Sequence, residues 1–470
     1  MRFDLSVRMK VPANTGDFSV VEEFAGAQLG NTRRTKRLQR IVERLEAQPS
    51  KSLPQALGTV ADREATYRFL NNDSISFESI LAPHFEATAK RAEAHDEALC
   101  IHDITECEFD TPAQREGLGR LRGKKSPQGF LAHTSLAVAF GEPREPLGLL
   151  AVQPWTRTEQ VRQMRRQAGR TEMDFWFKGA ALCEERCQSS LIHVMDRQGD
   201  SYELYAQLRT EQMRFVIRAC HDRLLPDGAK LFDTLHEAPL LVTRNVPLSR
   251  RALPKFLKQK QIYPERRART AELSVRAATV SVARSGWARG RLPSELTLNI
   301  VYVVEENPPA GQPPVSWYLV TTEPIDTPEQ VLKIVDIYRA RWLVEELFKA
   351  LKTGCQYERL QLESYDALLR ALAIYLPVAW QLLRLRYLAG AAPAAPATAV
   401  LTPVQIEILR AISGGALPQS PSVRDVLFAI AARGGHIKNN GEPGWLVIAR
   451  GLHDLLLIEV GWRAAIEVKK

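Results

Sequence analysis

The length, composition and charge of the chain bound the class of protein. Its 470 residues predict two or three domains, and 45% hydrophobic with 25% charged residues are the values of a soluble globular protein. The formal net charge of +9 indicates a polyanionic partner, although this bias is moderate for the length.

The cysteine pattern argues against a disulfide framework and against a zinc finger. The six cysteines include no CxxC pair and no spaced Cys/His zinc pattern. The first 16 residues lack the apolar stretch of a signal peptide, and no run of 18 strictly apolar residues occurs. We therefore expect a cytoplasmic protein with free thiols and no membrane association.

The N-terminal region, residues 1–75, is predicted to be a helical domain, with a compact three-helix module from residue 20. A dense basic patch opens its amphipathic helix, and this patch comprises Arg33, Arg34, Lys36, Arg37 and Arg40. Clustered cations release the counterions condensed on DNA, so this patch predicts contacts to phosphates. A solvated basic helix is the alternative interpretation.

The pattern changes to strands near residue 97. Three apolar segments predict an antiparallel meander, at 98–109, 129–140 and 146–155. A helix at about 170–188 and buried strands at 190–200 and 213–221 follow. This order predicts an α/β fold with an RNase-H-like catalytic core over residues 76–370.

Two aspartates stand out in this core. Asp103 lies inside the apolar first strand, and Asp196 ends a later buried strand. An unpaired buried carboxylate is costly, and a bound metal ion would account for it. The neighbouring His102 and His193 are interpreted as packed core residues, and Asp200 as solvated surface.

The remainder of the chain predicts an insertion and a second helical region. Residues 222–326 read as an all-β insertion with a basic loop at 250–269. Residues 371–470 are predicted to be helical, with apolar runs at 445–448 and 455–458. These runs predict either a dimer interface or a core within one chain.

The segment 338–352 predicts one helix with a polar face. Its polar residues keep helical spacing, and they are Tyr338, Arg341, Glu345, Lys349 and Lys352. Thr327-Pro328 with Gln330 forms a capping box that starts the helix, and Gly354 ends it. A solvated face with a Glu345–Lys349 pair is the alternative.

The three acids Asp103, Asp196 and Glu345 would make an oxygen-rich site. Such a site suits Mg²⁺ or Mn²⁺. Two such ions could serve an in-line displacement at phosphorus without a histidine or cysteine base.

Three segments together resemble the DDE cut-and-paste transposases of bacterial insertion sequences, in the branch with a Tyr-Arg-Glu-Lys signature. They read DITECEF, HVMDRQGD and IYRARWLVEELFKALKTG. The resemblance implies that the acids hold two Mg²⁺ ions, for which Mn²⁺ substitutes. It also implies DNA contacts by the polar helix face and by Trp317, Trp342 and Arg218.

The resemblance further implies a function. The enzyme would bind the inverted repeats at transposon ends, excise the element through hydrolysis and hairpin formation, and join its 3′ ends to target DNA. It would act on double-stranded DNA as a homodimer in the bacterial, nucleoid-associated cytoplasm. Cys220, Gln361 and Ala367 depart from the expected residues. A catalytically inactive DNA-binding relative and a simple metal-dependent nuclease are the alternatives.

Overall fold

The computed structural model describes residues 20–110, 113–123, 125–159, 163, 171–248, 265–286, 288, 290–437 and 441–468. The chain divides into two compact units. The sheet unit comprises His84–Phe348 and Glu363–Tyr365, and the helical unit comprises Met1–Pro83, Lys349–Leu362 and Asp366–Lys470.

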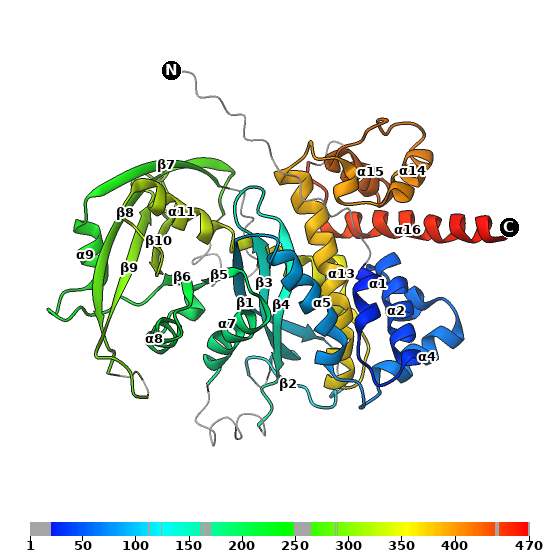
Figure 1. The fold of residues 1–470 in the computed structure, drawn as a ribbon, viewed down its shortest axis with the longest axis horizontal. Helices are drawn as coiled ribbons and strands as arrows, with labels where there is room; N and C mark the ends of the chain where they lie inside the picture. The colour runs from blue at the N-terminus through cyan, green and yellow to red at the C-terminus, as the bar shows by residue number, and fades with distance from the viewer. Residues whose placement is uncertain are drawn as a thin grey trace. The chain divides into compact units, whose positions relative to one another are not determined.

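The predicted meander opens the sheet unit. Its strands are β1 (Glu97–Phe109), β3 (Gln128–Ala139) and β4 (Pro146–Trp155), and a short β2 (Gly119–Arg120) pairs with β3. Both β1 and β4 run antiparallel to β3, at one end of the sheet. Figure 1 labels these three strands. Every residue of β3 is buried, because both faces of this strand are covered.

Two parallel strands continue the sheet on the other side of β1. They are β5 (Ser190–Met195) and β6 (Arg214–Ala219), and the helices beside them are α7 (Asp174–Arg186), η2 (Arg197–Gly199) and α8 (Tyr202–Thr210). The order β4–β3–β1–β5–β6, with β3 antiparallel to both its neighbours, is the RNase-H-like arrangement. The predicted fold class is confirmed.

The insertion extends the same sheet. Its strands are β7 (Leu240–Leu248), β8 (Arg269–Ala283), β9 (Glu295–Val304) and β10 (Ser316–Thr321). β10 pairs with β6, so the described strands form one ten-stranded sheet. The insertion also contains a helix, α9 (Leu231–Glu237). Most of the predicted basic loop, residues 249–264, lies outside the described residues.

The prediction of one continuous helix over residues 338–352 is wrong. The capping box is present at Thr327 and starts α11 (Pro328–Arg339), and α12 (Trp342–Lys349) follows. Between them the backbone N–H groups of Ala340 and Arg341 donate to carbonyls three residues back, so a tight turn separates the helices. A π-helical turn, η3 (Ala350–Gly354), closes the segment.

The helical unit contains the two terminal helical regions. Its elements are α1 (Val20–Glu23), η1 (Phe24–Gly26), α2 (Thr32–Ala47), α3 (Leu53–Leu57), α4 (Val60–Leu70), η4 (Tyr357–Arg359), η5 (Ala397–Ala399), α14 (Pro403–Ile412), α15 (Val423–Arg433) and α16 (Trp445–Val468). Three helices cross the division between the units along the chain, α5 (Phe77–Ala92), α12 and α13 (Tyr365–Ala391). Within the helical unit, Gln381 of α13 donates to Glu46 of α2 at 2.7 Å.

α13 is the core helix of this unit. Among the described residues, α13 alone is long and apolar enough to cross a membrane. However, 83% of its most apolar 18-residue stretch is buried inside the fold. Arg370 donates to the carbonyl oxygens of Leu70 and Ile75, at 2.8 and 2.6 Å. A buried helix of a folded unit accounts for its composition.

The two apolar runs of α16 differ in exposure. In the first run, Trp445 and Ile448 are buried within the helical unit, so the proposed interface role is wrong for these two side chains. The second run leaves Leu457 48% exposed, and Trp462 further along is 45% exposed.

Candidate active site

The first predicted acid, Asp103, lies in the middle of β1. It faces Thr134 of β3 in the strand register and is 9% exposed. One of its carboxylate oxygens accepts a hydrogen bond from the backbone N–H of Ile104 at 2.8 Å. A single backbone donor leaves most of the buried negative charge uncompensated.

Asp196 directly follows β5, which runs parallel to β1. His102 lies opposite Met195 in the register, so Asp103 and Asp196 occupy the next positions of neighbouring strands. The Asp196 carboxylate accepts from the backbone N–H of Gln198 at 2.8 Å. Burial, followed by the negative charge of Asp196, raises the pKa of Asp103 from 3.8 to about 7.

Arg341, which directly precedes α12, links the third acid, Glu345 of α12, to this site. Its guanidinium donates to Asp103 at 3.1 Å and also to Glu345. Burial disfavours the charge of Arg341, but Tyr338 and the two carboxylates outweigh burial and hold its pKa above the ordinary value. The guanidinium is therefore a permanent counter-charge for Asp103 and Glu345.

The three acids fit a divalent metal ion. Their donors are all carboxylate oxygens, which Mg²⁺ and Mn²⁺ prefer. Two of them already share one cation, Arg341. Burial and the negative charge of Asp196 raise the pKa of Asp103, so a further cation beside this carboxylate would stabilise its ionised form. The three carboxylates do not all lie within 4.8 Å of one another, so metal binding would draw them together.

A second group of predicted residues lies on β6, β10 and the end of α11. The ring of Tyr338 packs edge-on against Trp317, with centroids 5.5 Å apart. Arg218 donates to the carbonyl oxygen of Ser316 at 3.0 Å. Tyr338, predicted to lie on an open polar face, is 6% exposed, and burial raises the pKa of its phenol.

The remaining signature residues are more accessible. Trp342 is 52% exposed, and its indole N–H donates to Glu346 at 3.1 Å. Lys349 is an exposed residue at the end of α12. Lys352 lies in η3 and forms an ion pair with Glu358 at 3.1 Å. Lys349 and Lys352 both belong to the helical unit.

The basic helix α2 contains two kinds of cation. Arg33 and Lys36 are exposed, and Arg34 donates to the carbonyl oxygen of Leu29 at 3.0 Å. Arg37 and Arg40 instead pair with Asp62 of α4, at 3.2 and 3.0 Å. Asp62 is 5% exposed, so these two arginines hold α2 and α4 together.

Asp200 corrects a sequence-based interpretation. It was expected at the surface but is 5% exposed. It accepts hydrogen bonds from Tyr205 and from the backbone N–H groups of Cys220 and His221, and it pairs with Arg223. Its spacing after Asp196 gave no signal of these partners, which come from α8 and from the segment after β6.

A carboxylate-rich site on an RNase-H-like sheet is the arrangement of metal-dependent nucleases and polynucleotidyl transferases. Two family models give the particular kind. Residues 20–75 match the transposase DNA-binding model, and residues 184–378, which include Asp196 and Glu345, match the transposase DDE domain. The chain is a DDE transposase.

A solved structure also resembles this chain, the piggyBac transposase synaptic complex with hairpin DNA. The sequences are 10% identical, and the match covers 77% of this chain and 67% of that chain at a TM-score of 0.35. So loose a likeness assigns no role to any residue here.

Proposed function

We propose that this transposase binds the inverted repeats at the ends of its element, excises the element, and joins the 3′ ends to target DNA. The observation that carries this proposal is the meeting of Asp103, Arg341 and Glu345 beside Asp196. Excision would proceed by hydrolysis of one strand, attack of the freed 3′-OH on the other strand to form a hairpin, and opening of that hairpin. Each step is a displacement at phosphorus, so one site can serve all of them.

In this proposal, Asp103, Asp196 and Glu345 hold two Mg²⁺ ions. Bound divalent ions lower the pKa of a water or hydroxyl and stabilise the leaving oxygen. Arg341 would remain beside Asp103 and Glu345, where its charge limits the repulsion between the carboxylates. We assign phosphate contacts to Lys349 and Lys352.

Trp317 and Arg218 are assigned to the DNA next to the cleaved position. Trp317 is partly exposed on β10 and is supported by Tyr338. A flipped base stacking on its ring would gain roughly 1–3 kcal/mol. Trp342 presents a second exposed aromatic surface.

The test uses purified full-length chain, Mg²⁺ and labelled DNA that carries the repeats flanking the reading frame. Glu345→Gln should abolish cleavage and leave end binding intact, because it removes a metal ligand and no phosphate contact. Glu346→Gln is the matched control, since this acid lies on the same helix and bonds Trp342. Cleavage by Glu345→Gln at the rate of wild type would refute the assigned acids.

The same experiment separates the alternatives. Nicking without hairpins or joined products would indicate a simple nuclease. End binding without any cleavage by the wild-type chain would indicate an inactive DNA-binding relative.

A further inference from the structure

A buried layer of histidine and cysteine lies on the sheet face that α7 covers. Cys100 and His102 lie two residues apart on β1 and therefore point to the same face of the sheet. His193 of β5 lies opposite Cys100 in the register. All three side chains are fully buried. Successive side chains of a strand point to opposite faces, so Asp103, the residue after His102, projects to the other face of the sheet.

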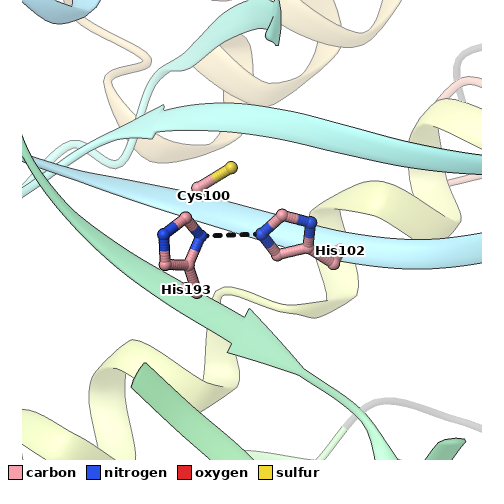
Figure 2. A group of neighbouring side chains, drawn as sticks. All are labelled: Cys100, His102 and His193. Carbon is pink, nitrogen blue, oxygen red and sulfur yellow. Dashed lines mark hydrogen bonds between the residues drawn. The ribbon is translucent and has the colours of Figure 1, made fainter. Parts of the chain in front are cut away.

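The nitrogen and sulfur atoms of these residues converge. His102 Nε2 and His193 Nδ1 lie 2.9 Å apart. Figure 2 draws the hydrogen bond between them. With the Cys100 sulfur they form a group whose ligand atoms all lie within 4.8 Å of one another. The Sγ atom of Cys183, on α7, is 3.4 Å from that of Cys100. Two thiols and two imidazoles are therefore contributed by three elements.

Each imidazole has an outer partner on its other nitrogen. His193 Nε2 donates to the Glu184 carboxylate at 3.0 Å, and His102 Nδ1 lies 2.9 Å from the Ser135 hydroxyl. Metal-binding histidines in proteins nearly always carry such an outer partner, which fixes the tautomer and the ring orientation. The nitrogens left over are the two that face each other.

A relay of hydrogen bonds would satisfy the nitrogens without a metal. In that state Ser135 donates to His102, His102 donates to His193, and His193 donates to Glu184. Such a relay requires neither thiol. In that state the two thiols are paired with each other, since the Cys100 S–H donates to the Cys183 sulfur at 3.4 Å.

We propose that Cys100, Cys183, His102 and His193 bind a structural Zn²⁺ ion. A tetrahedral zinc ion holds two imidazole nitrogens about 3.3 Å apart and two thiolate sulfurs about 3.8 Å apart, given its usual bond lengths. The two observed separations are 2.9 and 3.4 Å, so each pair opens by about 0.4 Å on binding. The group within 4.8 Å comprises Cys100, His102 and His193, so the Cys183 sulfur also has to move toward the two imidazoles when the ion binds.

The protons and charges balance in this site. Both thiols lose their protons to solvent, so two thiolates neutralise Zn²⁺. The His102 proton moves from Nε2 to Nδ1, where it is donated to Ser135, and His193 keeps its bond to Glu184. Four protein ligands leave no open position, so the ion would join β1, β5 and α7 rather than activate water.

The first test counts metal in the full-length chain, purified without a metal-affinity tag and dialysed against EDTA. We expect about one zinc ion per chain in wild type, since EDTA removes loosely held ions first. Cys100→Ser should retain less than about a tenth of that amount. Cys107→Ser is the matched control, because Cys107 is the other fully buried thiol of β1.

The second test uses Co²⁺ as a probe and does not depend on whether the variants fold. Wild-type chain unfolded and refolded with Co²⁺ should show a thiolate-to-cobalt charge-transfer band in the near ultraviolet. The oxygen ligands of the acid site cannot produce this band, and loss of transposition would not affect it. Zinc-free wild-type protein together with a cobalt spectrum lacking the band would overturn the proposal.

Discussion

Asp103 is the residue whose charge state most depends on what else occupies the acid site. Its pKa is raised from 3.8 to about 7, mainly by burial and by Asp196. Between these two pH values the folded chain keeps a proton that the unfolded chain has lost. The free energy of unfolding therefore falls as pH rises through this window when no metal is present.

The corresponding variant is Asp103→Asn. In EDTA, it should remove most of the loss of thermal stability that wild type shows between about pH 5 and about pH 8, an effect on the order of a few kcal/mol. Mg²⁺ should stabilise wild type more at the higher pH, because only the ionised carboxylate binds the ion. Thermal unfolding scans at both pH values provide the measurement. Parallel pH profiles of variant and wild type would contradict the assignment.

Arg341 provides a second prediction at the residue scale. Arg341→Ala should destabilise the metal-free chain by about 3 kcal/mol, because it leaves Asp103 and Glu345 without their shared counter-charge. Added Mg²⁺ should recover much of this loss. Arg339→Ala is the control, since its pair with Asp336 is more exposed and contributes less than about 1 kcal/mol. Equal losses in the two variants, unaffected by Mg²⁺, would show that Arg341 acts only through packing.

At the scale of elements, the two kinds of cation on α2 can be separated. Replacing Arg33 and Lys36 by Gln should reduce the slope of log binding constant against log salt by about two, as each phosphate contact contributes about one. Replacing Arg37 and Arg40 should instead lower the thermal stability of the chain, because Asp62 would be buried without its partners. Filter binding across a salt series and a melting curve give the two measurements. An unchanged slope for the first pair would make those side chains solvated surface.

Local signals in the sequence predicted the ends of elements better than their continuity. The capping box at Thr327 was correct. The break at Ala340 was not predicted, because residues in a tight turn and in an α-helix follow almost the same apolar pattern. Tyr338 keeps helical spacing yet is buried beside Trp317, a partner that is distant in sequence.

Contacts between distant segments account for the other differences. The pairing of β10 with β6 could not be read from either strand alone, so the insertion gave no sign of joining the central sheet. Asp200 looked like an ordinary surface acid because its partners lie on other elements. By contrast, Asp103 was identifiable because a carboxylate inside an apolar strand is itself an anomaly.

On the scale of the whole molecule, β1 links two chemically different sites. One face of the strand carries Asp103 and the oxygen-rich site, and the other carries Cys100 and His102 beneath α7. Hard and soft ligands are thus separated by the thickness of one sheet. A zinc ion on the second face would stabilise the two strands that position Asp103 and Asp196 without competing for Mg²⁺.

The last prediction concerns assembly. Cutting two ends and joining them to one target requires two active sites in a defined geometry, for which two-fold symmetry is the commonest solution. The exposed apolar side chains in the second half of α16, including Leu457 and Trp462, are our proposed contact. We further expect each catalytic site to act on the end bound by its partner's N-terminal module.

Mixing two inactive chains tests this arrangement. One chain carries Glu345→Ala, and the other has Arg33, Arg34 and Lys36 replaced by Gln. Mixed on end DNA, they should regain cleavage, because an intact site on one chain then meets an intact binding module on the other. Replacing Leu457 and Trp462 by Ser in both chains should abolish this rescue yet leave binding to a single end unchanged. Gel-shift and strand-cleavage assays give both readouts. Cleavage by a strictly monomeric wild-type complex, with no rescue in the mixture, would rule out action in trans, because each chain would then cut the end that it binds itself.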